Sequence, residues 1–532
     1  MLEVREATAA DVMGIRDVFM TSYGEEYPYH EFLEPEALTR LVYSENSILL
    51  VAIDSDSRRV LGTASVVMNI GAFGDLTAEF GRLAVHPDAR GQGAGTLLMK
   101  ERLCRARDRI HVGIVENRIV HSYSQKISRR HGFVPVGFLP WKLRFIHRES
   151  VALYLQHFGD ALRLRRNNPR IIPEVHPLAE FSLKNCGQEA DAVVRDHAAS
   201  YPHEEDFELQ EMTTDGFSSL LRIQRGRIHR REVFGPVRLH YGLFQLQARQ
   251  CNYLIARRDG RIAGGLGFLV DHVEKSVRVF ELLSVDDRPI HFLISNLVRL
   301  CRQEWGIEYI EVDVSAYAPR MQQTFLECGF LPSGYLPAWV FHNVERLDVV
   351  RMSRLLIPPD IPDPDVIDEA TPLTNYVLKQ FRRQGVIPEV ADAIGEIDFF
   401  EDMTHEQAVC VAEICTTQSY QAGQFLFAVG DDPSELFLVL QGQVRLLSGD
   451  QGTGPCELIE RDLIGETSIV SPRPHTLAAV AETPSLCAVI PRDDFQKLIR
   501  RRTDIAVLLY RNLARSLASK LRRSNLREAE LY

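Results

Sequence analysis

The sequence predicts a multidomain α/β plus β protein, in which two tandem mixed α/β units precede a small β-roll with flanking helices. A chain of 532 residues is too long for one hydrophobic core and suggests three or four domains. HGFVPVGFLPW (131–141) returns as CGFLPSGYLPAW (328–339), which indicates an internal repeat. After about Phe399, short apolar runs alternate with glycine and Asp-Asp turns, as is typical of a small all-β domain.

Two further sequence similarities occur in the same order in both halves of the first two-thirds of the chain. TSYGEEYPYHEF (21–32) corresponds to AASYPHEEDFEL (198–209), and the strand–turn–strand pattern of 47–67 corresponds to that of 252–270. We therefore expect one copy of the α/β unit at 1–150 and a second at 176–345, joined by a linker at 151–175.

The order of elements is clearest in the first copy. A long strand is predicted at 76–86, a helix at 95–108, a strand at 109–115 and a short helix that ends at Gly132. The Pro- and Asp-rich stretch IPPDIPDPD predicts an extended linker at 346–390. The β-roll and its C-terminal helices are expected at 391–532.

Composition excludes several classes of function. A net charge of −11 argues against a general DNA binder, and no apolar run is long enough to cross a membrane. The polar N-terminus does not resemble a signal peptide. Nine cysteines form no CxxC pair, so we expect free thiols in the cytoplasm and no metal site.

The loop ARGQGAG (89–95) is the strongest candidate for a binding site. Gly91, Gly93 and Gly95 remove side chains where backbone N–H groups can face a ligand, and the loop leads into a helix N-terminus. This arrangement favours a diphosphate. The spacing matches neither GxxxxGK[ST] nor GxGxxG.

LAVHPDARGQGAGTLLM (83–99) resembles the acetyl-CoA-binding motif of the GNAT N-acetyltransferases, [QR]-x-x-G-x-[GA], in which Arg90, Gly93 and Gly95 fill the defining positions. The resemblance implies that Leu83, Ala84 and Val85 pair their backbone with the pantetheine arm. It also implies that the pyrophosphate of acetyl-CoA is cradled by Arg90, Gly91, Gln92, Gly93, Ala94, Gly95 and Thr96.

The same resemblance suggests catalytic residues. Glu79 lies six residues before Val85, hence on the same strand face, and its place matches the catalytic glutamate of the histone acetyltransferase branch. It would deprotonate the attacking amine, although a surface role is the alternative. Many family members have a tyrosine where this chain has Ser128. Tyr123, or His121, is then the candidate acid or substrate contact.

The second copy lacks the glycine loop. Its equivalent stretch is DRPIHF, in which Pro289 removes an N–H donor and Ile290, His291 and Phe292 would fill a cradle. It resembles a degenerate GNAT domain that does not bind acetyl-CoA. Its expected role is structural, or to help form the acceptor site.

The C-terminal region resembles a cyclic-nucleotide-binding domain. QAGQFLFAVGDD (421–432) has the expected turn glycines, and IGETSIVSPRPHT (464–476) resembles the phosphate-binding cassette. The resemblance implies that cAMP or cGMP is bound by Gly465, Glu466, Thr467, Arg473 and Thr476. Arg473 would pair with the phosphate and Glu466 with the ribose hydroxyl. The cassette is short and contains Pro474, so a domain kept only for interaction is the alternative.

These observations predict a cyclic-nucleotide-regulated N-acetyltransferase that moves an acetyl group from acetyl-CoA to an amine. The arrangement resembles the cAMP-regulated protein lysine acetyltransferases, which makes a protein lysine the expected acceptor. A small-molecule amine acetyltransferase and a non-enzymatic nucleotide sensor or scaffold are the alternatives. The last helix resembles one that pairs subunits, so a homodimer is possible.

Overall fold

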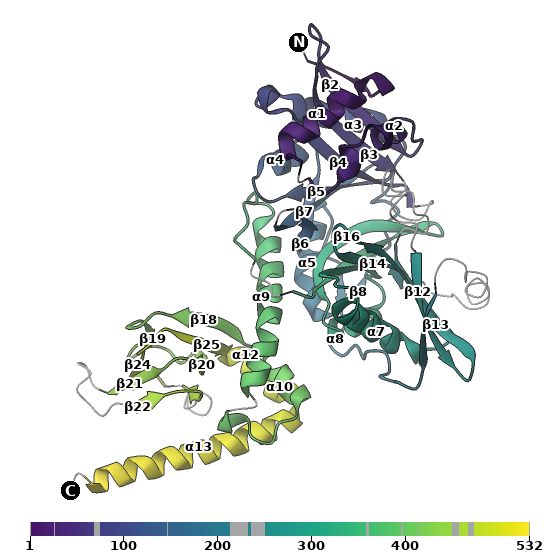
Figure 1. The fold of residues 1–532 in the computed structure, drawn as a ribbon. Coiled ribbons are helices and arrows are strands. Elements are labelled where there is room, and N and C mark those ends of the chain that lie inside the picture. Colours follow the sequence, from purple (N-terminus) through teal and green to yellow (C-terminus); the bar gives the residue numbers. More distant parts are fainter. Residues whose placement is uncertain are drawn as a thin grey trace. The chain divides into compact units, whose positions relative to one another are not determined.

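The computed structural model describes residues 2–25, 27–68, 75–145, 147–212, 232–235, 251–357, 361–394, 397–412, 414–448, 457–465 and 473–530. The chain forms two compact units, Met1–Leu378 and Lys379–Tyr532. Each is described by itself below (Figure 1). Among these residues, no helix combines the length and the apolar character needed to cross a bilayer.

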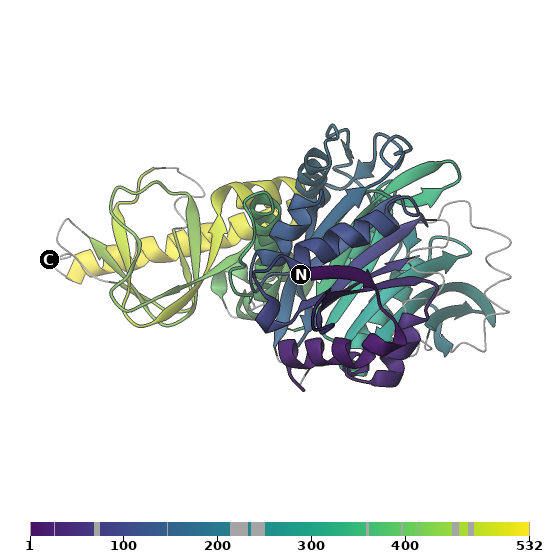
Figure 2. The ribbon, with the colours of Figure 1, turned by 90° about the horizontal axis from the view of Figure 1, so that it is seen from above.

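The first unit is built on one 15-stranded sheet with the strand order β1-β2-β3-β4-β5-β7-β6-β16-β17-β15-β14-β13-β12-β10. The strands of the first copy are β1 (Leu2–Glu6), β2 (Ser47–Asp54), β3 (Val60–Met68), β4 (Thr77–Val85), β5 (Val112–Arg118), β6 (Val134–Arg144) and β7 (Arg148–His157). Its helices are α1 (Val12–Tyr23), α2 (Pro35–Val42), α3 (Ala94–Ala106) and α4 (Tyr123–Arg130). Figure 2 shows α1 and α2 on one face of these strands and α3 on the other.

The second copy follows the same order. Its strands are β10 (Glu208–Met212), β11 (Val233–Phe234, paired with β15), β12 (Cys251–Arg258), β13 (Arg261–Asp271), β14 (Ser276–Ser284), β15 (Tyr309–Ser315), β16 (Leu331–His342) and β17 (Glu345–Leu355). Its helices are α7 (Pro289–Gln303) and α8 (Pro319–Glu327). Read outward from the β6–β16 junction, the two halves repeat one topology, with a single parallel pair in each, β4–β5 and β14–β15.

The repeated sequence motif forms the junction. Gly137 of β6 pairs with Gly334 of β16, and these are the corresponding glycines of the two repeats. A Cβ at Gly137 would lie 2.8 Å from Ser333 O, so the close approach of the strands requires glycine there. Buried residues of both copies, such as Val136, Leu139, Leu336 and Trp339, form one hydrophobic core.

The two copies also exchange equivalent polar contacts. Phe341 N–H of the second copy donates to Asp75 Oδ1 of the first (2.9 Å), and Arg144 N–H of the first donates to Glu274 Oε2 of the second (2.6 Å). Both β6 and β16 contain a β-bulge, at Leu139–Leu143 and at Leu336–Val340. The guanidinium of Arg148, on β7, donates to Trp141 O in the first bulge, and that of Arg346, on β17, donates to Ala338 O in the second. Each copy therefore contributes an equivalent set of hydrogen bonds to the junction.

The structure differs from the two predicted linkers. Residues 151–157 belong to β7, and the segment 346–390 contains most of β17 and of α9 (Thr371–Ile394). These strands lie beyond the repeated GF motif, where the sequence similarity of the copies ends. Between the copies lie β8 (Arg170–Ile171), α5 (His176–Asn185) and β9 (Val193–Val194).

The second unit contains two four-stranded sheets, β18-β25-β20-β23 and β19-β24-β21-β22. The strands are β18 (Thr416–Tyr420), β19 (Phe425–Phe427), β20 (Glu435–Gln441), β21 (Val444–Ser448), β22 (Glu457–Ile459), β23 (Leu463–Ile464), β24 (Leu477–Ala481) and β25 (Ser485–Pro491). The helices are α10 (His405–Ala412), α12 (Arg492–Arg501) and α13 (Thr503–Glu530). Gly423, Gly430 and Gly442 have positive φ angles, which explains the glycine turns read from the sequence.

Candidate active site and nucleotide site

The glycine loop connects β4 to α3 and leaves its backbone accessible. Gly91 and Gly93 have φ angles of 79° and 86°, and Gly93 is the N-cap of α3. A Cβ at either position would meet no atom within 4 Å, so side chains do not fill the loop. Leu97 N–H donates to Gly93 O (3.0 Å), and the amides just before it have no intrahelical acceptor. The loop can therefore bind an anionic group such as a diphosphate.

β4 departs from a regular strand beside this loop. Its register against β3 shifts so that Arg82 and Leu83 together oppose one residue, and Arg82 has a φ of 55°. β4 pairs with β5 over Thr77–Glu79 alone, and beyond this point residues of both strands line a cavity. The parting of two parallel strands leaves main-chain groups of β4 available to a ligand.

Glu79 and Val85 lie on opposite faces of β4, which corrects the expectation that they share one. The six-residue spacing applies to a regular strand, and the β-bulge adds a residue that reverses the alternation. Glu79 pairs with Val67 and Ala84 with Thr63, and these two partners lie on one face of β3. Ala84 therefore shares the face of Glu79.

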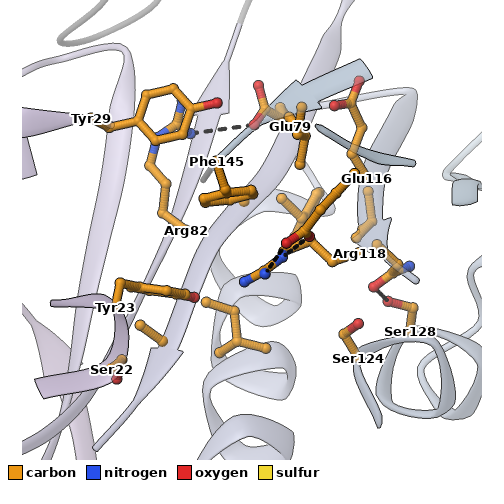
Figure 3. A pocket seen from close by; sticks show the side chains of 18 of the residues that line it. Ser22, Tyr23, Tyr29, Glu79, Arg82, Glu116, Arg118, Ser124, Ser128 and Phe145 are labelled. Carbon is orange, nitrogen blue, oxygen red and sulfur yellow. Dashed lines mark hydrogen bonds and ion pairs between the residues drawn. The ribbon is translucent and has the colours of Figure 1, made fainter. Parts of the chain in front are cut away.

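Glu116 is a second carboxylate of the site that the sequence analysis missed. It follows Ile114, the β5 partner of Glu79, by two residues and so lies on the same face of the sheet. Figure 3 shows both carboxylates extending in the same direction. Glu116 forms an ion pair with Lys142, whereas the contact of Glu79 Oε1 with Arg82 Nη1 is long, 3.5 Å. The Glu79 side chain is 30% exposed and is therefore open to a substrate.

Arg102 supports the bulge from the α3 side. Its guanidinium is fully buried and donates to Ser65 O (3.2 Å) and to Gly81 O (3.0 Å) at the bulge. It lies 5.6 Å from the centre of the Phe80 ring. Burial lowers the pKa of Arg102 to about 9. No pattern in the sequence distinguishes this arginine from one on a solvated helix face.

An aromatic wall faces the carboxylates. Tyr27 stacks on Tyr23 at 4.7 Å and lies 5.3 Å from Tyr29, measured between ring centres. Phe145 lies 6.3 Å from Tyr29, and the Arg118 guanidinium lies 4.3 Å above the Phe145 ring. The wall combines apolar area with π faces that attract cations.

The candidates for the general acid lie near the start of α4. Tyr123 is its first residue, is 71% exposed and packs against His121 with ring centres 5.3 Å apart. Ser128 is buried, and its Oγ donates to Asn117 Oδ1 at 3.2 Å. The geometry assigns the acid role to none of these residues.

All of these elements border one cavity of about 1660 Å³. The predicted residues that line it are Glu79, Leu83, Ala84, Val85, Arg90, Gly91, Gly93, Ala94, Gly95, Thr96 and Tyr123. Gln92 lies outside this lining, because its amide donates to Ala89 O and its side chain donates to Asp88 O. The second copy contributes part of the lining from β13, β14, β15 and the turn after β13, including Asp271, Glu274, Arg278, Tyr309 and Glu311.

The equivalent stretch of the second copy, DRPIHF, contains no glycine and begins the helix α7. Pro289 is the first residue of α7, Ile290 and Phe292 are buried, and His291 stacks on His203 at 3.7 Å. Arg278 pairs with Glu311 of β15 at the position where Glu79 pairs with Ile114. This copy therefore lacks both the open loop and the carboxylate.

The predicted nucleotide-binding residues are described in part. Gly465 follows β23 with a φ of 88°, and Arg473 and Thr476 are exposed in the segment before β24. Glu466 and Thr467 lie outside the described residues. His475, which the sequence analysis missed, stacks on Phe427 at 3.9 Å and donates its amide to Asp431 O. It fixes the segment that carries Arg473 to the turn after β19.

Comparison with known families gives two matches. The Acetyltransferase (GNAT) domain matches residues 45–135, and the Cyclic nucleotide-binding domain matches residues 417–502. The chain contains a GNAT domain and a cyclic nucleotide-binding domain. The first matches the part of the chain that holds Glu79 and the glycine loop, and it is an acyltransferase domain that implies acetyl-CoA as co-substrate. The second implies a cyclic nucleotide effector.

Individual relatives match only parts of the chain. It is 29% identical over 147 residues to Glutaminase 2 of Bradyrhizobium diazoefficiens, covering 27% of this chain and 23% of that protein. It is 26% identical over 133 residues to the cGMP-dependent protein kinase, isozyme 1, of Drosophila melanogaster, covering 24% and 17%. The chain thus spans about a fifth of the length of these relatives. The ribosomal-protein-alanine N-acetyltransferase structure from Brucella melitensis is 22% identical, with 29% of this chain and 99% of that chain covered and a TM-score of 0.27.

Proposed function

We propose that the protein is a cyclic-nucleotide-regulated N-acetyltransferase that transfers an acetyl group from acetyl-CoA to a primary amine. The observation that carries the proposal is the open glycine loop, which borders the same cavity as Glu79. The second copy is a degenerate GNAT domain, because it repeats the strand order and lacks the loop and the glutamate. A protein lysine and a small amine both present the nitrogen that this chemistry requires.

The chemistry follows from the positions of the groups. The loop amides and the α3 N-terminus hold the diphosphate, which directs the thioester toward the parted strands. Glu79 takes the proton of the ammonium, directly or through water, so that the nitrogen lone pair can attack the carbonyl carbon. A main-chain N–H at the bulge stabilises the oxyanion. The C–S bond then breaks, and the thiolate of CoA takes up a proton.

A paired substitution tests the assignment of the base. Glu79→Gln should lower kcat for acetyl transfer by about 10²- to 10⁴-fold, while the Kd for acetyl-CoA stays within a few-fold of wild type. Glu116→Gln is the matched variant on the same sheet face, and it should lower kcat much less. Mass spectrometry of acetylated amines and calorimetry with acetyl-CoA supply the two readouts. An E79Q protein as active as wild type would disprove the role of Glu79.

Regulation requires a route from the nucleotide domain to the cleft, and the segment 361–370 supplies one. It precedes α9, the helix that begins in the first unit and ends in the second. Gln125 of α4 is fully buried, donates to Asp365 O (2.8 Å) and accepts from Ile367 N–H (3.2 Å). Ser122 N–H donates to Asp365 Oδ2 (3.0 Å). Because α4 lines the cavity, a shift of this segment would reach the site.

A further inference from the structure

The carboxylates that line the cavity fall into two groups. Glu79, Glu116, Glu149 and Glu311 each form an ion pair, with Arg82, Lys142, Arg118 and Lys142, respectively. Asp271 and Glu274 form none with any described residue. Both belong to the second copy. The cavity therefore has acidic groups without an ion-pair partner among the described residues at the side that this copy supplies.

Glu274 is an unusual carboxyl. Its residue is 7% exposed, Oε2 accepts from Arg144 N–H, and Oε1 has no hydrogen-bond partner among the described residues. Two guanidinium groups nearby bind main-chain oxygens instead of this carboxyl: Arg148 donates to Glu274 O and pairs its charge with Glu308, and Arg144 donates to Val273 O. A buried carboxyl with a free oxygen at a cavity wall is costly unless something binds there.

Asp271 lies beside Glu274. Its Oδ1 accepts from the amides of Val273 and Glu274, both at 2.9 Å, which leaves Oδ2 for another group. Glu31 of the first copy is close enough that burial and the charge of Asp271 raise the pKa of Glu31. The charges of Asp271 and Glu31 repel each other, and a cation would relieve that repulsion.

The aromatic wall continues to the same place. Phe145 follows Arg144, whose amide binds Glu274, and its ring lies 6.1 Å from that of Tyr27 and 6.3 Å from that of Tyr29. Aromatic faces and carboxylates together form the usual surroundings of an organic cation.

We propose that Asp271 and Glu274 of the second copy form a subsite for a second cationic group on the acceptor, so that the preferred acceptor is a small diamine or polyamine. This inference rests on the proposed function, with the reacting nitrogen near Glu79. It also gives the second copy, which has no cofactor loop of its own, a role in substrate choice.

The test compares 1,4-diaminobutane with n-butylamine, which differ in the second charge. At pH 8.5, above the pKa of about 8 to which burial raises Glu274, both carboxyl groups are charged. Wild type should then show a kcat/KM at least about tenfold higher for the diamine. Asp271→Asn and Glu274→Gln should bring the ratio toward one, because the diamine alone loses a contact. Asp75→Asn is the matched control, since Asp75 makes the equivalent strand contact in the first copy, and it should keep the wild-type ratio.

The results separate this proposal from the previous one. Calorimetry of each amine binding to the complex of the protein with CoA should also give a lower Kd for the diamine than for the monoamine. Diamine binding without acetyl transfer would contradict the transferase and leave the subsite standing. The subsite would be overturned if wild type showed equal kcat/KM and Kd values for the two amines. It would also be overturned if the preference for the diamine persisted in both the Asp271→Asn and the Glu274→Gln variants. A lysine peptide without a second basic residue that outperforms the diamine would do the same.

Discussion

At the scale of single residues, the buried carboxyl of Glu274 makes the protein sensitive to pH. Burial raises the pKa of Glu274 from 4.5 to about 8. The hydrogen bond from the Arg144 amide acts in the opposite direction, because it stabilises the charged carboxylate. The folded state therefore holds a proton that the unfolded state releases between these values. Its contribution to stability is complete below pH 4.5 and is lost as the pH rises toward 8.

Urea unfolding of wild type and Glu274→Gln at several pH values measures this effect. The free energy of unfolding of wild type should fall relative to that of E274Q by up to about 1.4 kcal/mol per pH unit between pH 4.5 and 8. If the free energies of unfolding of the two proteins changed with pH in the same way, Glu274 would have the same pKa in the folded and unfolded states, which would contradict this prediction.

A second prediction at this scale concerns the glycine loop. Gly93→Ala places a side chain at a left-handed backbone position, which costs about 1 kcal/mol, and adds a methyl group where the diphosphate would lie. Its affinity for acetyl-CoA should fall about tenfold or more. Gly187→Ala is the control, with a φ of 71° and equally open surroundings. It should lower only the melting temperature, and a similar loss of affinity there would argue against a specific role of the loop.

At the scale of elements, the strand junction predicts unequal effects of equal substitutions. Gly137→Ala would bring a Cβ to 2.8 Å from Ser333 O, whereas a Cβ at Gly334 would find its nearest atoms at 3.4 Å. We expect G137A to destabilise the first unit by about 1–3 kcal/mol through overpacking, and G334A to be nearly neutral. Thermal unfolding of both variants is the measurement, and equal melting temperatures would contradict this account of the junction.

The elements also show which structural features could be predicted from the sequence. The repeat, the strand before the loop and the helix after it were predictable, because glycine spacing and apolar runs are local signals. The bulge at Arg82 was not, since a non-glycine residue with positive φ leaves no local mark, and so the face of Glu79 was predicted wrongly with respect to Val85. Glu274 reaches Arg144 across 130 residues of chain, a contact that no spacing reveals.

At the scale of the whole molecule, the Gln125 contacts predict where the proposed regulation can be interrupted. Gln125→Leu would remove both bonds to the segment before α9, and the effect of cAMP or cGMP on kcat/KM should then shrink or disappear. Gln322 of α8 is the matched control, because it is also fully buried and holds the segment before α5 through Ile172 N–H and Arg170 O.

Gln322→Leu should lower stability by a similar amount, about 1–3 kcal/mol for the lost buried hydrogen bonds, and keep the response to nucleotide. Acetylation rates with and without nucleotide, beside unfolding curves, separate the two effects. Loss of regulation in both variants would mean that general destabilisation, and not the segment, is responsible.

The duplicated contacts at the Gly137–Gly334 junction carry a consequence for how such a chain can arise. An ancestor with one half would associate with an identical molecule through the same atoms and would have two equal clefts. Once fusion made the association permanent, one half could exchange glycines for Pro289 and Ile290 without dissociating from the other. A fused pair can therefore be asymmetric, so that under the proposed function one half carries the reaction and the other shapes the site for the acceptor.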